Sequence, residues 1–359
     1  MQIKKKLIKS IKLYIIFFYF IIFINIFFIS NVKANLFEIS DLKISEPFDI
    51  NFNKGKVIDK GFREAFVELI SMITTSGDKE KILNTSLSQI KSLIDSFTME
   101  DEKFINNQYQ VKFDVNFNKK NTLIFFEKKN IFPALPKKKK LLIIPVLVNL
   151  QKDEILLFNN NIFYEKWDEK EKRYYLLNYI LPSEDLEDVD LLSQNSKSIE
   201  DYNFKKTISK YDLQDFIITI IYKNNNKLRV LSKIKLDEKT KIESTVYEAI
   251  DFSKEKDIDF VISSLKTNYE NHWKNINKIN TSIKLPITVS IDSKEYNKIT
   301  VLENSLNELN FVSDFFITKF NNKNIFFKII YNGSPDKFII DMKKKGILLN
   351  TEEQIWKIQ

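Results

Sequence analysis

The stretch FVSDFFITKFNNKNIFFKIIYNGSP, residues 311–335, decides the fold of the C-terminal part of the chain. Val312–Phe320 and Ile325–Tyr331 are rich in β-branched and aromatic residues, and the Asn-rich turn between them predicts a hairpin. Pro335 then stands where a helix can begin, because the first helical turn has no use for the N–H that proline lacks. The stretch therefore predicts a strand, a second strand and a helix.

The residues on either side extend this pattern. A strand is expected at Leu285–Ile291 and a helix at Tyr296–Leu309 before the quoted stretch. A helix at Pro335–Lys345 and a strand at Gln354–Ile358 are expected after it. The order is β-α-β-β-α-β, the split unit of ferredoxin-like folds, and a linking helix from about Ile258 to Ile279 precedes it.

Helical and strand periods alternate nearer the N-terminus. Apolar residues recur at helical spacing from Phe62 to Ile73, and we expect Gly77 to be the C-cap of this helix. A second helix is expected from Leu87 to Phe97. Apolar and polar residues then alternate from Tyr109 to Phe117, which predicts a half-buried strand.

The middle of the chain carries the longest continuous apolar run after the N-terminal segment. Leu141–Val148 predicts a strand covered on both faces, and Pro145 places it at an edge or a bulge. A helix is expected at Ile199–Lys210. Phe216–Tyr222 and Leu228–Leu236 predict a hairpin that turns at a run of asparagines.

These patterns predict an α/β (α+β) protein of two to three small mixed domains, since the chain is too long for one ordinary core. The expected segments are a signal peptide at 1–34, an N-terminal α/β domain at 35–136, a middle α/β domain with an acidic box at 137–256, and a linking helix plus ferredoxin-like domain at 257–359.

The first 34 residues have the three parts of a cleavable signal peptide. Lysines precede an apolar run from Leu13 to Ser30, and Val32-Lys33-Ala34 fits the small-residue cleavage rule. We expect cleavage between Ala34 and Asn35, which would send the protein to the periplasm. The alternative is an uncleaved anchor in the inner membrane, because the apolar run is long enough to span a bilayer.

The charge of the chain gives no indication of nucleic-acid binding. The formal net charge is +8, but six lysines and no acid lie in the first 34 residues. The remaining chain keeps 50 basic against 48 acidic residues, and its lysines alternate with acids as on a solvated surface. We therefore expect no nucleic-acid partner.

The composition also narrows the chemistry. The chain has no cysteine, which excludes disulfides, thiolate chemistry and a lipid anchor on a cysteine. Its single histidine, His272, lies in a polar, Asn-rich helix and is interpreted as a surface residue. The five glycines offer no phosphate-binding loop, and no cofactor is expected.

The most distinctive local string is Leu181-Pro182-Ser183-Glu184-Asp185-Leu186-Glu187-Asp188, here named the acidic box. It resembles the L-P-x-x-D-x-E-D box of an uncharacterised family of exported proteobacterial proteins, the domain-of-unknown-function family numbered twenty sixty-six. The resemblance rests on Leu181, Pro182, Asp185, Glu187 and Asp188 and extends as a pattern from about Asn35 onward. It implies a periplasmic location and no particular activity.

The acids of the box allow three interpretations. Asp185, Glu187 and Asp188 are the candidates for a metal site, since carboxylates bind hard cations, or for acid–base catalysis. Alternatively, Asp185 and Glu187 cap or brace the loop at the start of a helix. We favour this structural role, because neither a nucleophile nor a base partner accompanies the box.

Taken together, the sequence predicts a non-catalytic binding or assembly module of the bacterial cell envelope, with another envelope protein as its partner. The alternatives are an envelope-polymer enzyme or cation-dependent binder that uses the acidic box, and a membrane-anchored protein with a periplasmic body. An exposed strand edge at Phe311–Phe320 is a candidate surface for a partner chain.

Overall fold

The computed structural model describes residues 37–170 and 172–359, so the expected signal peptide and its cleavage position lie outside the described residues.

Apolar and polar residues alternate along the strands of the first of three sheets. The first sheet has the order β1 (Glu38–Pro47), β3 (Gln108–Phe117) and β2 (Ile94–Ile105). Every second residue of β3 from Tyr109 to Phe117 is buried, as the alternation predicts.

Four helices accompany the first sheet: α2 (Lys54–Ile73), α3 (Ser76–Ile82), α4 (Leu87–Leu93) and α5 (Lys119–Lys128). Helix α2 packs closely on β3, because a Cβ on Gly61 would lie 3.1 Å from the Phe113 ring. The prediction that Gly77 is a C-cap is wrong. Helix α2 ends at Ile73 with Thr74 as its extended C-cap, and Gly77 lies in the first turn of α3.

The second sheet surrounds the apolar run of the middle segment. Strand β4 (Lys139–Asn149) pairs in parallel with β6 (Leu177–Ile180) and β7 (Phe216–Asn224) and antiparallel with β5 (Glu154–Leu156). Antiparallel strands β8 (Lys227–Leu236) and β9 (Lys239–Tyr247) complete the sheet. The predicted hairpin is thus confirmed, with Asn225 at its turn in the left-handed conformation.

Pro145 occupies a gap in the pairing on one side of β4, while its other side pairs with Thr219 of β7. Strand β6 pairs with β4 only up to Leu142, and β5 pairs with it only from Leu147. Pro145 lies between these two stretches, and its carbonyl accepts a hydrogen bond from Asn161 Nδ2 at 3.1 Å. A residue without an N–H is tolerated there, so the proline marks a local edge within an otherwise central strand.

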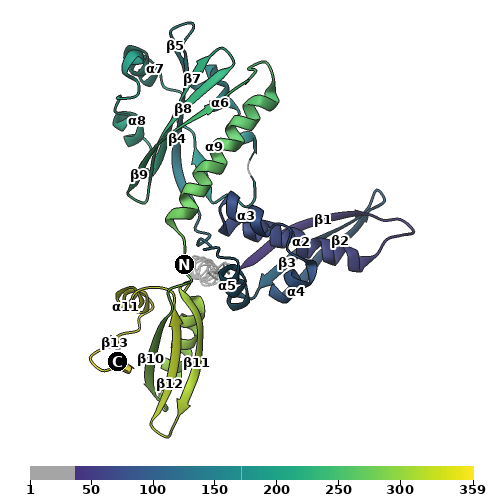
Figure 1. Ribbon diagram of the computed structural model, residues 1–359, viewed down its shortest axis with the longest axis vertical. Coiled ribbons are helices and arrows are strands. Elements are labelled where there is room, and N and C mark those ends of the chain that lie inside the picture. Colours follow the sequence, from purple (N-terminus) through teal and green to yellow (C-terminus); the bar gives the residue numbers. More distant parts are fainter. Residues whose placement is uncertain (1–36, 171) are drawn as a thin grey trace, which may run out of the picture. The chain divides into compact units, whose positions relative to one another are not determined.

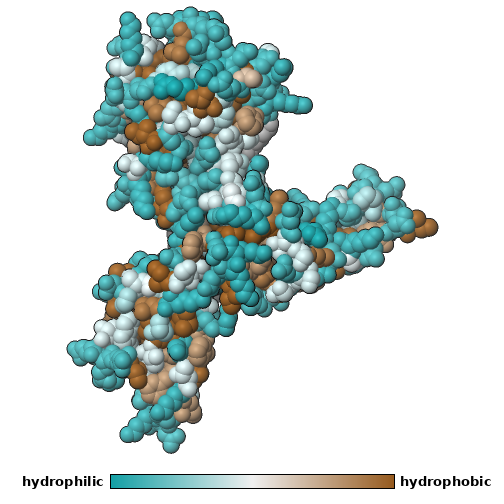
Figure 2. Space-filling model, viewed as in Figure 1, coloured by the Kyte–Doolittle hydropathy of each residue, from teal (hydrophilic) through white to brown (hydrophobic). Residues whose placement is uncertain are grey.

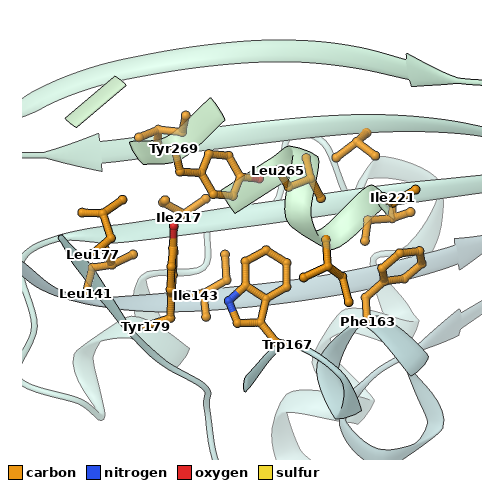
Figure 3. Packing of buried hydrophobic residues seen from close by; sticks show 14 of the residues in the cluster. Leu141, Ile143, Phe163, Trp167, Leu177, Tyr179, Ile217, Ile221, Leu265 and Tyr269 are labelled. Atoms are coloured by element: carbon orange, nitrogen blue, oxygen red, sulfur yellow. The ribbon is translucent and has the colours of Figure 1, made fainter. Parts of the chain in front are cut away.

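Helices and apolar clusters cover both faces of the second sheet, as the continuous apolar run predicts. One face packs against α9 (Glu255–Ile276) through a cluster that contains Trp167, Leu265 and Tyr269 (Figure 3). The other face packs against a cluster that contains Leu192 and Phe204. The remaining helical segments here are η1 (Phe158–Asn160), α6 (Ile162–Glu165), η2 (Asp168–Lys170), α7 (Leu186–Gln194), η3 (Ser196–Ser198) and α8 (Lys205–Ser209). Helix α8 is much shorter than the helix predicted at 199–210.

The third sheet has the order β11-β12-β10-β14-β13. Figure 1 labels β10, β11, β12 and β13. Its elements are β10 (Leu285–Asp292), α10 (Tyr296–Glu308), β11 (Val312–Phe320), β12 (Asn324–Tyr331), α11 (Pro335–Lys344), β13 (Leu349–Asn350) and β14 (Trp356–Ile358). The predicted order holds through α11. Two short strands then complete the sheet where one was expected, and β14 lies beside β10 and parallel to it.

The fold class is therefore a mixed α/β (α+β) protein of several small mixed domains, as the sequence predicts. The domains within residues 39–359 contact one another and together make up one compact unit. Among the helices of the described residues, none combines the length and the apolarity that a membrane span needs.

Candidate functional site

The acidic box forms the junction between β6 and α7. Asp185 is the N-cap of α7, and its Oδ1 accepts a hydrogen bond from the backbone N–H of Glu187 at 2.8 Å. Such a cap satisfies a helical N–H that has no partner within the helix. The structural role that the sequence suggested for Asp185 is thus observed.

Lysines of the α8 region hold the other acids of the box. Lys210 Nζ lies 2.7 Å from Asp185 Oδ2 and 3.1 Å from Asp188 Oδ1. Asp188 is only 1 % exposed and also accepts a hydrogen bond from Thr207 Oγ1 at 2.8 Å. Glu187 forms an ion pair with Lys206 on the surface. The acids therefore attach α8 to the start of α7.

Two tyrosines fix the loop that precedes this cap. Tyr164 donates to the carbonyl of Pro182 at 2.7 Å, and the N–H of Ser183 donates to the hydroxyl of Tyr211 at 2.7 Å. Leu181 packs against the apolar cluster under α9. The box is a tightly hydrogen-bonded loop and cap.

The electrostatics of the box follow from these contacts. The hydrogen bond from Lys210 and the N–H of Glu187 lower the pKa of Asp185, and the two aspartates raise the pKa of Lys210. The structure brings Asp185 and Asp188 together on one ammonium group, while Glu187 pairs separately with Lys206. Within residues 37–170 and 172–359, no three acidic or histidine side chains are grouped as a metal site requires.

His272 lies on α9 and is half-buried, rather than fully exposed as the sequence suggested. Burial lowers the pKa of its ring, and Nε2 has no hydrogen-bond partner among the described residues. Nε2 thus has no described neighbour that could orient the ring, as a catalytic histidine requires.

Strand β11 is an edge strand of the third sheet, as the sequence suggested. It pairs with β12 on one side, and no other strand of the described residues pairs with it. Phe316, Ile317 and Phe320 are 46 %, 50 % and 68 % exposed. Figure 2 shows that apolar residues reach the surface among hydrophilic ones in this part of the molecule. Helix α5 lies beside the start of this edge, where Lys120 pairs with Asp314 at 2.7 Å. The exposed apolar side chains further along β11 can accept another chain.

Basic side chains flank this edge. Lys319 lies in β11, Lys323 in the turn that follows, and Lys328 in β12 opposite Phe316. None of the three forms an ion pair with a described residue, although Lys319 Nζ lies 5.8 Å from the centroid of the Phe326 ring. The edge thus offers apolar contacts and unneutralised positive charge together.

Sequence reasoning missed a group of buried charges on α9. Lys266, Glu270 and Lys274 are 1 %, 2 % and 5 % exposed, and they follow one another at intervals of four residues. Residues four apart share one face of a helix. Each of the last two follows an apolar core residue directly: Glu270 follows Tyr269, and Lys274 follows Trp273. The sequence signal for these buried charges was therefore a charged residue repeated beside the apolar face of a long helix.

Comparisons with known proteins give no family for this chain. No family model and no curated protein matches it. A solved crystal structure of an uncharacterized protein aligns with 40 % of this chain and 95 % of its own length, at 9 % identity and a TM-score of 0.16. So low a TM-score carries no inference about fold or function.

Proposed function

We propose that this chain is an exported, non-catalytic binding module of the bacterial cell envelope, which acts in the periplasm. The observation that carries the proposal is the open edge of β11, where Phe316, Ile317 and Phe320 are exposed beside Lys319 and Lys323. The partner would be another envelope protein that adds an extended segment to this edge.

Strand addition explains how such an edge could bind selectively. Main-chain hydrogen bonds along the edge give affinity, and alternate side chains of the added strand give specificity. Between two irregularities of the ladder, Asp314–Ile317 pairs regularly with β12. A regular edge this short fits a weak, transient interface. The flanking lysines favour a partner segment with apolar and acidic residues.

Export is supported by the sequence. The lysine-rich start, the apolar run from Leu13 to Ser30 and the small residues before Asn35 have the order of a signal peptide. The resemblance of the acidic box to the exported family numbered twenty sixty-six points to the same compartment.

A non-catalytic role is supported by the use of the acidic box. Asp185 caps α7, and Asp188 and Glu187 pair with lysines, so the acids are engaged in holding the fold. One observation favours the alternative of a cation-dependent binder or an enzyme at the box: Asp188 Oδ2 is buried and has no hydrogen-bond partner among the described residues.

Affinity capture from native envelopes tests the proposal. The bait is the chain from Asn35 onward, in wild-type form, as a Phe316→Glu plus Phe320→Glu double variant, as an Asp185→Ala plus Asp188→Ala double variant, and without residues 280–359. Ile242→Glu is the matched control, because Ile242 is 68 % exposed on β9, an edge strand of the second sheet.

We expect one defined envelope protein to bind the wild type, the Ile242→Glu control and the acidic-box variant. The β11 variant and the truncated chain should lose it. A synthetic peptide from the bound partner should then bind the purified chain. Loss of the partner only with the acidic-box variant would move the function to the box, and capture of no partner by any bait would contradict the proposal.

A further inference from the structure

A small cavity with charged residues in its lining lies between α3, α9 and the segment before β6. Its volume is about 160 Å³, and its lining includes Lys79, Tyr175, Glu270 and Lys274. A water molecule in liquid water takes up about 30 Å³, so the cavity has room for roughly five waters or a small organic molecule. The chain elements around it belong to the compact unit of residues 39–359.

Glu270, one of the lining residues, has a carboxylate oxygen that is not used in the fold. Its Oε1 accepts hydrogen bonds from the backbone N–H groups of Leu176 and Leu177, at 2.9 and 2.8 Å. Its Oε2 is buried and has no hydrogen-bond partner among the described residues. A buried polar oxygen without a partner is costly, and a carboxylate oxygen can accept from an ammonium group.

Lys274 and Lys79 supply unused donors. Lys274 Nζ donates to the carbonyl of Ser71 at 2.5 Å, which leaves two of its three N–H groups available. Lys79 is half-buried, and its Nζ lies 5.4 Å from the centroid of the Tyr174 ring. Neither lysine forms an ion pair with a described residue. Burial lowers the pKa of Lys274 to about 8 and also lowers that of Lys79.

The arrangement places a carboxylate and two ammonium groups around one small space. A simple anion would be repelled by Glu270, and a simple cation would be repelled by both lysines. A molecule that carries both signs of charge satisfies all three groups, and Tyr174 and Tyr175 provide aromatic walls for its body. Charge-assisted hydrogen bonds of this kind are stronger than neutral ones.

We propose that this cavity binds a small zwitterion, a free α-amino acid. Glu270 Oε2 accepts from the ligand's ammonium group, and Lys274 and Lys79 donate to its carboxylate. The site does not involve β11 and would operate whether or not the strand edge binds a partner.

Calorimetric titration of the purified chain, from Asn35 onward, tests this inference. The probes are glycine, L-alanine and L-glutamate, with succinate, ethanolamine and inorganic phosphate as comparators that lack one of the two charges. We expect at least one amino acid to bind and to raise the melting temperature of the protein, and the comparators to bind at least about tenfold more weakly.

Three variants decide the role of the side chains. Glu270→Gln and Lys79→Gln should each weaken amino-acid binding by about tenfold or more. Lys81→Gln, at an exposed position on the same helix α3, is the matched control and should bind as the wild type does. Because Lys79 is only half-buried, Lys79→Gln should fold even if Glu270→Gln does not.

The inference is overturned if no amino acid binds at millimolar concentration. It is also overturned if succinate or ethanolamine binds as tightly as the amino acids, or if Lys79→Gln leaves the affinity unchanged in a folded protein.

Discussion

The Nζ atom of Lys210 lies 3.1 Å from Oδ1 of Asp188, whose side chain is almost fully buried at the first turn of α7. The same ammonium group also contacts Asp185, the N-cap of that helix. Two acids of the box thus share one cation from the α8 region. This contact explains how the box can be a distinctive sequence motif whose role is to stabilise the folded structure.

Asp188 should therefore contribute to stability. Asp188→Ala removes the acceptor for Thr207 and Lys210, and hydrogen bonds to charged groups contribute about 2 kcal/mol. We expect the free energy of unfolding, measured in urea, to fall by about that amount. Asp190→Ala, at an exposed acid of the same helix, is the control and should change it by less than about 0.5 kcal/mol. Equal effects of the two substitutions would contradict the structural role of Asp188.

Substitution of two glycines by alanine should change the stability of the protein in opposite directions. Gly346 follows α11 with a φ of +77°, where a side chain is strained, so Gly346→Ala should destabilise the protein by about 1 kcal/mol. Gly77 lies in helix α3 with open space around its Cβ position, so Gly77→Ala should stabilise it by about 0.5 kcal/mol. Thermal unfolding of the two variants beside the wild type measures both. A destabilised Gly77→Ala would argue that this glycine is not helical.

The buried carboxyl of Glu270 should make stability depend on pH. Burial raises its pKa from 4.5 to about 7, so the folded protein holds this proton more tightly than the unfolded chain does. The free energy of unfolding should therefore fall by up to about 3 kcal/mol as the pH rises from about 4.5 to about 7. The pKa of Lys274 is lowered to about 8. Lys274 should therefore make the free energy of unfolding rise as the pH increases from about 8 to about 10.5.

Urea unfolding across this pH range measures the effect, with Glu270→Gln as the test variant. Glu270→Gln should remove the fall between about pH 4.5 and pH 7, whereas Glu80→Gln, at an exposed glutamate of α3, should keep it. An unchanged pH profile for Glu270→Gln would show that other groups cause the dependence.

Export should produce a mature chain that begins at Asn35. Intact-mass measurement of the protein from a periplasmic extract should find this N-terminus. Ala34→Arg places a large charged residue at the cleavage position and should leave the precursor in the membrane. Carbonate extraction separates the outcomes, because it releases a cleaved chain and retains an anchored one. Retention of the wild type would favour the anchored alternative.

Local patterns predicted the C-terminal elements well, because each carries its own signal. Val312–Phe320 agrees residue for residue with β11, and Pro335 begins α11 behind the N-cap Ser334. The order of the last strands could not be read from the sequence. Strand β14 reaches β10 through pairing between distant residues, which periodicity does not encode.

Tertiary pairing overrode local pattern where the prediction was wrong. Ile94 and Phe97 continue the helical spacing that begins at Leu87, yet both belong to β2. They pair with Phe117 and Val115 of β3, and the sheet determines their conformation. The same limit applies to the candidate sites, because the capping role of Asp185 could be predicted from its place before a helix, whereas the cavity at Glu270 depends on segments far apart in the sequence.

Amide hydrogen exchange of β11 tests the central claim most directly. It is measured on the chain from Asn35 onward, alone and with the captured partner or its peptide. In the free protein, the amides of Asp314–Ile317 that do not face β12 should exchange quickly, while those of β12 stay protected. Binding should slow the exchange of these β11 amides. Full protection of β11 in the isolated monomer, or unchanged exchange after binding, would contradict a strand-addition site at this edge.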